Sequence, residues 1–214
     1  MNKNKFIILT GAANSGKSIL AQNMAETLYR DGFNVHFLRS PARGILMGPK
    51  PLKDLREKPR VYLRLQEKIF EAQLDQLYEA SKRNYDEPAV FIFDRFILDT
   101  FMYVNLYCKP KGLFKRALLE KKLNLMRRIF NNAVFIADEL QPLFIHCAPI
   151  PITQYGPFRP SNIKQKAEDA ELMLQLYELA HSCDANKLHM ISANTTNKVS
   201  LEAVKEKIYS YLNS

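Results

Sequence analysis

The residues whose types and spacing point most directly to chemistry occupy positions 11–18, where the sequence reads GAANSGKS. This run fits the pattern G-x-x-x-x-G-K-[ST] of a phosphate-binding loop, or P-loop. In such a loop, backbone N–H groups surround an anion at the positive end of a helix dipole. Lys17 can reach the β- and γ-phosphates of a nucleotide, and the Ser18 hydroxyl can bind Mg²⁺. The motif predicts a site for ATP and Mg²⁺ that is lined by Gly11, Asn14, Ser15, Gly16, Lys17, Ser18 and Ile19.

The segments on either side of the motif have the order that a P-loop requires. Residues 6–10 read FIILT, an apolar and β-branched run that is typical of a buried strand. Residues 19–28 carry apolar side chains at helical spacing. The alternative is a chance glycine turn followed by a helix cap, which needs no such context. The order strand, glycine loop, helix therefore favours a true nucleotide site.

A second candidate group follows the apolar run at residues 89–93, which predicts a central parallel strand. Asp94 ends this run and Arg95 comes next. Ligands of open α/β sheets bind outside the carboxyl ends of the strands, so Asp94 is expected near the P-loop. There it could hold Mg²⁺ through water or orient the attacking oxygen, and Arg95 could clamp a phosphate. Alternatively, Asp94 caps a helix. Asp99, one turn further, could face the same cleft, but it is expected to be a surface carboxylate.

Further cations stand in two loops that the sequence places near the same edge. Arg39 ends the second apolar run, at residues 35–38, and Arg43 lies close by, so both are expected on the acceptor side of the P-loop. Residues 158–166 read FRPSNIKQK and include Arg159. This segment predicts a lid, at about residues 149–168, whose cations close over the transferring phosphate and exclude water. Solvated surface charge is the alternative interpretation of both loops.

Short apolar runs alternate with longer helical patterns along the chain, which is typical of an α/β fold. The expected strands are residues 6–10, 35–38, 89–93, 143–147 and 188–192. Helices are expected at residues 60–84, 96–140, 162–182 and 200–213, with interruptions at residues 109–112 and at Asn131-Asn132. The pattern predicts a three-layer P-loop fold with a five-stranded parallel sheet flanked by helices. Because the alternation never changes class, residues 1–214 are expected to form a single domain.

Composition places the chain among ordinary globular proteins, with 47% hydrophobic and 25% charged residues. No apolar run approaches the length of a membrane span, and the amino-terminal residues do not form a secretory leader. Three widely spaced cysteines match neither a disulfide framework nor a zinc site, which favours a cytoplasmic location. The net charge of +9 favours anionic partners, either nucleotides or, less so, nucleic acid.

These motifs resemble the thymidylate kinase-like branch of the P-loop kinases, which includes nucleoside monophosphate and deoxynucleoside kinases. The resemblance rests on the P-loop, on Arg39-Ser40-Pro41 and on Asp94-Arg95-Phe96, and more generally on residues 174–180 and 189–193. It implies that the γ-phosphate of ATP moves, with Mg²⁺, to a small nucleotide-type acceptor, above all a deoxynucleoside monophosphate, in nucleotide metabolism. Related enzymes are often dimers, so a homodimer is a possible assembly.

The resemblance also implies roles for residues on the donor side. Lys17 and Ser18 would bind the donor phosphates and Mg²⁺. Asp94 would support the metal or deprotonate the acceptor. The catalytic group would comprise Lys17, Asp94, Arg95 and Arg159, with Arg159 acting from the lid.

On the acceptor side, the resemblance implies a substrate-binding group. Arg39 and Arg95 would hold the acceptor phosphate or sugar, with Arg43 close by. Phe70 and Gln73, on the long helix, fall where related enzymes stack on and hydrogen-bond an acceptor base. Residues of an apolar helical stripe belong to the core by default, so a core position is the alternative for both.

Departures from the family pattern keep other functions open. Ser40 stands where the family has Glu, and in deoxynucleoside kinases a carboxylate there is the usual base for a sugar hydroxyl. Its absence argues against a nucleoside kinase unless Asp94 replaces it. The pattern Asp-Arg-x-x-x-Asp, completed by Asp99, also resembles nicotinamide riboside kinases. The positive charge leaves a kinase acting on modified DNA as an alternative, and a non-catalytic ATP-binding switch is another.

Overall fold

Strands and helices alternate along the chain and build one parallel sheet. The computed structural model describes residues 4–11, 15–46, 57–83, 85, 87–109, 112, 115–147, 171–172, 175, 189–193 and 198–214. The strands are β1 (Lys5–Thr10), β2 (Asn34–Leu38), β3 (Ala89–Asp94), β4 (Leu143–Cys147) and β5 (His189–Ala193). The helices are α1 (Lys17–Arg30), α2 (Ala42–Leu46), α4 (Pro59–Lys82), α5 (Ile97–Tyr107), α6 (Lys115–Leu140) and α8 (Lys198–Leu212).

The five strands are ordered β2-β3-β1-β4-β5, and all neighbours are parallel. β1 is therefore the central strand, with β3 on one side and β4 on the other. The registers pair Leu9 with Asp94 and Thr10 with His146, so the carboxyl ends of the three middle strands lie side by side. β3 and β4 are buried along their whole length, as their mostly apolar sequences predict. The α/β fold with a five-stranded parallel sheet is confirmed.

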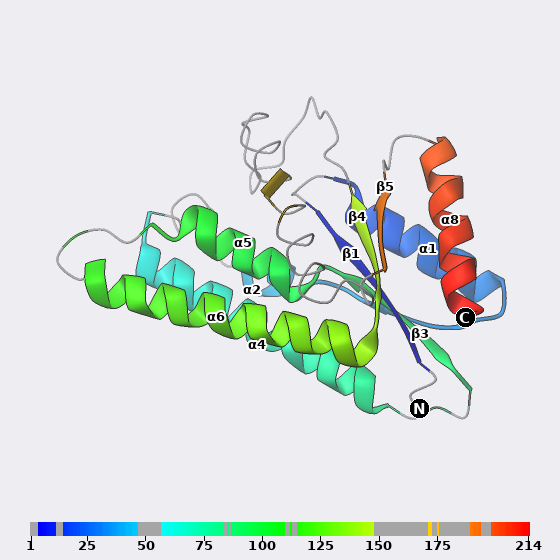
Figure 1. Cartoon of the computed structure of the whole chain (residues 1–214), viewed down its shortest axis with the longest axis horizontal. Helices are drawn as coiled ribbons and strands as arrows, with labels where there is room; N and C mark the ends of the chain where they lie inside the picture. The colour runs from blue at the N-terminus through cyan, green and yellow to red at the C-terminus, as the bar shows by residue number, and fades with distance from the viewer. Residues whose placement is uncertain are drawn as a thin grey trace.

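Helices cover both faces of this sheet, and the result is the expected three-layer arrangement (Figure 1). Successive strand residues point to opposite faces. On β1, Phe6 and Ile8 pack in the core beneath α4, α5 and α6, whereas Ile7 and Leu9 pack in a second core beneath α1 and α8. Each helix thus buries an apolar stripe against one face of the sheet. The sheet holds the loops at its carboxyl edge in fixed positions.

The prediction of a helix break at Asn131-Asn132 is wrong, because α6 continues through both residues as a helix of 26 residues. Asparagine is only mildly unfavourable in a helix, and tertiary packing overrides it here. Ile129 and Ala133, on either side of the pair, are buried. The Asn132 amide donates to the backbone carbonyl of Arg128 at 2.8 Å, so its side chain is satisfied within the helix. The interruption expected near residues 109–112 does separate α5 from α6.

Two predictions fall largely or wholly outside the described residues. These are the lid at about residues 149–168 and most of the helix expected at residues 162–182. The single domain spanning residues 1–214 stays a prediction. Within the described residues, none of the helices combines the length and the apolar character needed to cross a membrane.

Candidate active site

Both glycines of the P-loop motif have backbone angles that favour glycine, and Gly11 also has no room for a side chain. Gly11 directly follows β1 with a φ of 131°. A Cβ atom on it would lie 2.4 Å from the backbone carbonyl oxygen of Cys147, at the end of β4. Gly16 caps α1 with a φ of 77°, in the left-handed region that favours glycine. Gly11 thus lies tight against the carboxyl end of β4, and Gly16 begins α1.

Lys17, the first residue of α1, is buried. Its side chain is only 4% exposed, and its ammonium group donates to the Ser15 hydroxyl at 2.9 Å. Burial, and then the nearby positive charge of Arg95, lower the pKa of Lys17 from 10.5 to about 7, although Asp99, Cys147 and Asp94 oppose the shift. A lysine held this way gains favourable interactions as soon as an anion enters.

Ser18 and Asp94 meet across the site. The Ser18 hydroxyl donates to one Asp94 carboxylate oxygen at 2.6 Å. The other oxygen, Oδ1, is buried and makes no hydrogen bond within the described residues. A hydroxyl beside a carboxylate with a spare oxygen is a donor set that suits Mg²⁺. The described residues hold no cluster of three or more metal-binding side chains, so such an ion would take its other ligands from phosphates and water.

Arg95 directly follows β3 and has an unusual backbone conformation, with a φ of 118°. This value is rare for a residue with a side chain and costs about 1–3 kcal/mol. Its guanidinium donates to Asp99 at 3.3 Å and to the Tyr103 hydroxyl at 3.2 Å, and it lies over the Tyr103 ring. Burial works against its charge, but Tyr103, Asp99 and Asp94 together keep the pKa of Arg95 above its ordinary value. Arg95 is therefore a fixed cation beside Lys17.

Asp99 is a central residue of the site, which was the second of the two positions that the sequence allowed for it. The expectation that it is a surface carboxylate is wrong, because it is 1% exposed. Besides Arg95, it accepts a hydrogen bond of 2.6 Å from the Thr10 hydroxyl at the end of β1. The spacing of four residues from Arg95 to Asp99 is one turn of helix and was the available signal.

The end of β4 contributes two further residues that the sequence did not single out. His146 is 4% exposed, and its Nδ1 atom makes no hydrogen bond within the described residues. Burial, and then the charge of Lys17, lower its pKa to about 4, so His146 is neutral at pH 7. Burial raises the pKa of Cys147 to about 12, although Lys17 opposes this shift. Its thiol is therefore protonated and unreactive.

The remaining predicted site residues are spread more widely. Arg39 is exposed after β2, and its backbone carbonyl accepts from Gln76 at 3.2 Å. Ile19 points outward with 70% exposure. Asn14, Arg159 and the side chain of Arg43 lie outside the described residues.

Phe70 and Gln73, the proposed contacts of an acceptor base, are both buried. Phe70 is 0% exposed and belongs to the core beneath α4. Gln73 accepts from the Thr100 hydroxyl at 2.8 Å and donates to the backbone carbonyl of Phe96 at 3.4 Å. Gln73 thereby ties α4 to the start of α5, next to Arg95. Contact of either residue with a base stays a prediction.

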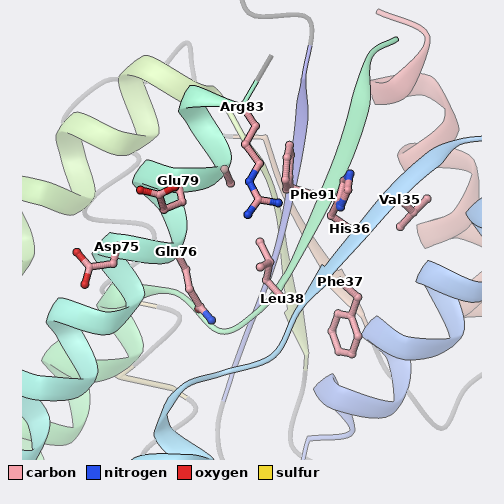
Figure 2. A pocket seen from close by; sticks show the side chains of 10 residues that line it. Val35, His36, Phe37, Leu38, Asp75, Gln76, Glu79, Arg83 and Phe91 are labelled. Carbon is pink, nitrogen blue, oxygen red and sulfur yellow. The ribbon is translucent and has the colours of Figure 1, made fainter. Parts of the chain in front are cut away.

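A separate cavity of about 490 Å³ lies between β2 and the carboxyl-terminal half of α4 (Figure 2). Its lining includes His36, Leu38, Gln76 and Arg83 but no residue of the P-loop and neither Asp94 nor Arg95. The His36 ring, in the middle of β2, stacks on Phe91 at a centroid distance of 5.0 Å. This cavity is therefore distinct from the candidate active site.

A family model described as "AAA domain" matches residues 6–147, which include every strand end of the site. The chain belongs to this family. Solved structures resemble the AAA domain chain over nearly its whole length. The NadR protein in complex with NR has a TM-score of 0.62 at 20% sequence identity, and the match covers 99% of this chain and 52% of that chain. The AAA domain chain thus spans about half the length of the NadR protein.

A thymidylate kinase from Ehrlichia chaffeensis matches the AAA domain chain with a TM-score of 0.45 at 15% identity, over 95% of this chain and 98% of that chain. No curated protein matches the sequence. The family match and the likeness to NadR confirm the P-loop fold. The resemblance to the group of nucleotide and nucleoside kinases is thereby confirmed at the level of the fold.

Proposed function

We propose that this AAA domain chain is an ATP- and Mg²⁺-dependent phosphotransferase that moves the γ-phosphate of ATP to a nucleotide-type acceptor, first of all a deoxynucleoside monophosphate. Its setting would be cytoplasmic nucleotide metabolism. The observation that carries the proposal is the meeting of Lys17, Ser18, Asp94 and Arg95 at one edge of the sheet. Phosphoryl transfer depends on positioning and charge neutralisation rather than on covalent work by the protein. These four residues supply both the positioning and the charge neutralisation.

The donor half of the reaction would use the P-loop. Its backbone N–H groups would surround the phosphates, and the Lys17 ammonium group would offset the charge of the β- and γ-phosphates. Ser18 and the spare oxygen of Asp94 would hold Mg²⁺, which, when bound, offsets the negative charge of the phosphates. Arg159 would close from the lid, a role that stays a prediction.

The acceptor half supports a monophosphate. Arg95 is held rigidly by Asp99 and Tyr103 and is a planar fork suited to a phosphate. A phosphate oxygen is already a nucleophile and needs no strong base. Ser40 occupies the place where a base would be expected for a sugar hydroxyl. The absence of a carboxylate at that position therefore favours a phosphate acceptor over a hydroxyl.

A nucleoside-type acceptor such as nicotinamide riboside is the second candidate. The observation that favours it is the buried contact of Asp99 with Arg95, which completes the pattern Asp-Arg-x-x-x-Asp within one site. The NadR structure, which contains NR, is also a fold neighbour. In this case Asp94 would act as the base for the sugar hydroxyl, with its spare oxygen as the proton acceptor.

Release of ADP under identical conditions tests these alternatives. The acceptors are the four deoxynucleoside monophosphates, nucleosides, nicotinamide riboside and short DNA strands of several lengths. We expect turnover with a monophosphate and its loss in Lys17→Met. Turnover only with nucleosides or nicotinamide riboside would support the second candidate, and dependence on DNA length would indicate a polynucleotide kinase. Tight ATP binding without turnover on any acceptor would indicate a switch and contradict the proposal.

A further inference from the structure

The cavity between β2 and the carboxyl-terminal half of α4 takes no part in the proposed phosphotransferase. Its volume of about 490 Å³ lies within the range of about 300–1,000 Å³ that is typical of small-molecule sites. One of its walls, β2, is an edge strand of the sheet in the part of the chain that the structure describes. We call this space the β2–α4 cavity.

The wall that the sheet contributes to the β2–α4 cavity is apolar. Leu38 and Phe91 lie on the face of the sheet that α4 covers. The Phe91 ring is 1% exposed and stacks on the Phe6 ring at a centroid distance of 5.5 Å, so it is held in place. Across the cavity, α4 presents the small side chain of Ala80, which leaves the space unfilled. The rings of Phe91 and His36 favour an aromatic ligand, because aromatic pairs gain more than their buried area alone provides.

Arg83 brings a positive charge to this cavity. It is the residue that ends α4, and Figure 2 shows its guanidinium directed toward the sheet, whereas the carboxylates of Asp75 and Glu79 point away from the sheet. The guanidinium donates to the Tyr85 hydroxyl at 3.4 Å and forms no ion pair with a carboxylate among the described residues. The side chain is exposed, so a ligand can reach its N–H groups. A guanidinium in this setting favours a ligand with an oxyanion.

His36 adds a second polar group near Arg83. Its ring stacks on Tyr85 at a centroid distance of 4.8 Å as well as on Phe91, and these contacts fix the plane of the imidazole. The Nε2 atom is buried and makes no hydrogen bond within the described residues, although such a nitrogen is usually paired. Burial, and then the charge of Arg83, lower the pKa of His36 below its usual value. An oxyanion at Arg83 would therefore act on the imidazole too, with the opposite sign.

We propose that the β2–α4 cavity is a second binding site, for a small aromatic molecule that carries a carboxylate or a phosphate group. The ring of this molecule would lie against Leu38, Ala80 and Phe91. Its oxyanion would bind the Arg83 guanidinium beside His36. Because none of these residues belongs to the candidate active site, binding here does not depend on phosphate transfer.

Other ligands match only part of the cavity. A metal cation or an amine would be repelled by Arg83, and the carboxylates of Asp75 and Glu79 point away from the sheet. Inorganic phosphate would bind Arg83 but leave the apolar wall in contact with water. An uncharged ring would cover that wall and leave Arg83 without a counter-charge. A molecule that joins a ring to an oxyanion matches both features.

The test observes the imidazole nitrogens of the full chain by two-bond ¹H–¹⁵N NMR spectroscopy. The chain has four histidines, and the His36 signal is identified by its loss in His36→Phe. Benzoate and phenyl phosphate are the probes, and they distinguish a carboxylate ligand from a phosphate ligand. We expect a saturable shift of the His36 signal with at least one of them, at a Kd of about 1 mM, which is ordinary for probes of about ten non-hydrogen atoms. Benzyl alcohol and inorganic phosphate should each cause a much smaller shift.

A pair of variants tests the role of the guanidinium. Arg83→Gln removes its charge and should weaken binding of the anionic probe by at least about tenfold. Lys82→Gln is the matched control, because it removes the same charge one residue earlier, where the ammonium group lies over the exposed Tyr78 ring. It should bind the probe as the wild type does. Circular dichroism checks that both variants are folded.

Several results would overturn the proposal. One is a His36 signal that does not shift with either anion up to about 10 mM, roughly ten times the expected Kd. Another is an equal response to benzyl alcohol or to inorganic phosphate, because ring and oxyanion would then not act together. Equal binding by Arg83→Gln and Lys82→Gln is a third. A shift confined to His146, which senses the charge of Lys17, would place the probe in the candidate active site instead.

Discussion

At the scale of single residues, the site holds two cations close together, and a bound anion would offset their mutual repulsion. Lys17 is buried beside the positive charge of Arg95, and these two effects lower the pKa of its amine to about 7. Arg95 stays charged because Tyr103, Asp99 and Asp94 surround it. A bound polyphosphate would raise the pKa of Lys17 again, because its negative charge offsets the effects of burial and of Arg95.

This arrangement predicts that ATP binding takes up a proton above pH 7. Free Lys17 loses its proton as the pH rises through about 7, whereas Lys17 bound to phosphates keeps it to a higher pH. Between the two pKa values, the apparent affinity should fall by up to about tenfold per pH unit. Calorimetry at pH 8 in two buffers of different ionisation enthalpy measures the uptake. Lys17→Met should bind weakly and without proton uptake, and wild-type binding without uptake would contradict the shift.

Asp99 is predicted to act on the acceptor through Arg95. Asp99→Asn keeps an oxygen to accept from Thr10 but removes the charge that holds the guanidinium. The loss of a hydrogen bond to a charged group, about 1.5–3 kcal/mol, should lower kcat/KM for the acceptor by about 10- to 100-fold. The KM for ATP should rise by less, since Asp99 also favours the charged form of Lys17 but burial and Arg95 outweigh that effect. Tyr103→Phe removes one hydroxyl acceptor and should cause a smaller loss. Unchanged acceptor kinetics in both variants would show that Arg95 does not bind the acceptor.

At the scale of elements, the ends of β1 and β4 approach so closely that the P-loop has no room for a side chain at its first position. Gly11→Ala would place a methyl group 2.4 Å from a backbone oxygen, at a φ that alanine avoids. We expect a loss of at least about 1–3 kcal/mol in the free energy of unfolding in urea. Gly44→Ala is the matched control, because a Cβ there meets nothing within 4 Å. An equal effect of both substitutions would contradict this close approach.

The elements also show how far the sequence determines the fold. The strands were predictable within about one residue, because each is a short, mostly apolar run. The predicted helix break at Asn131-Asn132 is absent, because the packing of Ile129 and Ala133 outweighs the low helix propensity of asparagine. The P-loop was predictable because its residues are contiguous. The hydrogen bond of Asp99 with Thr10 and the effect of the Lys17 charge on His146 depend on strand order, which no local pattern specifies.

At the scale of the whole molecule, the candidate active site sits where the two halves of the sheet meet. β1 separates the pair β2-β3 from the pair β4-β5. The site takes Asp94 from β3, Lys17 from the helix after β1, and the backbone of Cys147 from β4. A ligand bound there contacts elements on both sides of the central strand. Binding should therefore stabilise the sheet as a unit rather than one loop alone.

Thermal unfolding tests this coupling. With Mg²⁺ and a non-hydrolysable ATP analogue at about 100 times its Kd, binding adds about 2.7 kcal/mol to stability. For a chain of this size, the Tm should rise by roughly 5–10 °C. Lys17→Met should unfold near the wild-type Tm without ligand and show little of this rise, because Lys17 is the cation that the phosphates engage. A full shift in Lys17→Met would place the nucleotide elsewhere, since a ligand that stabilises the sheet without this buried amine cannot occupy the P-loop.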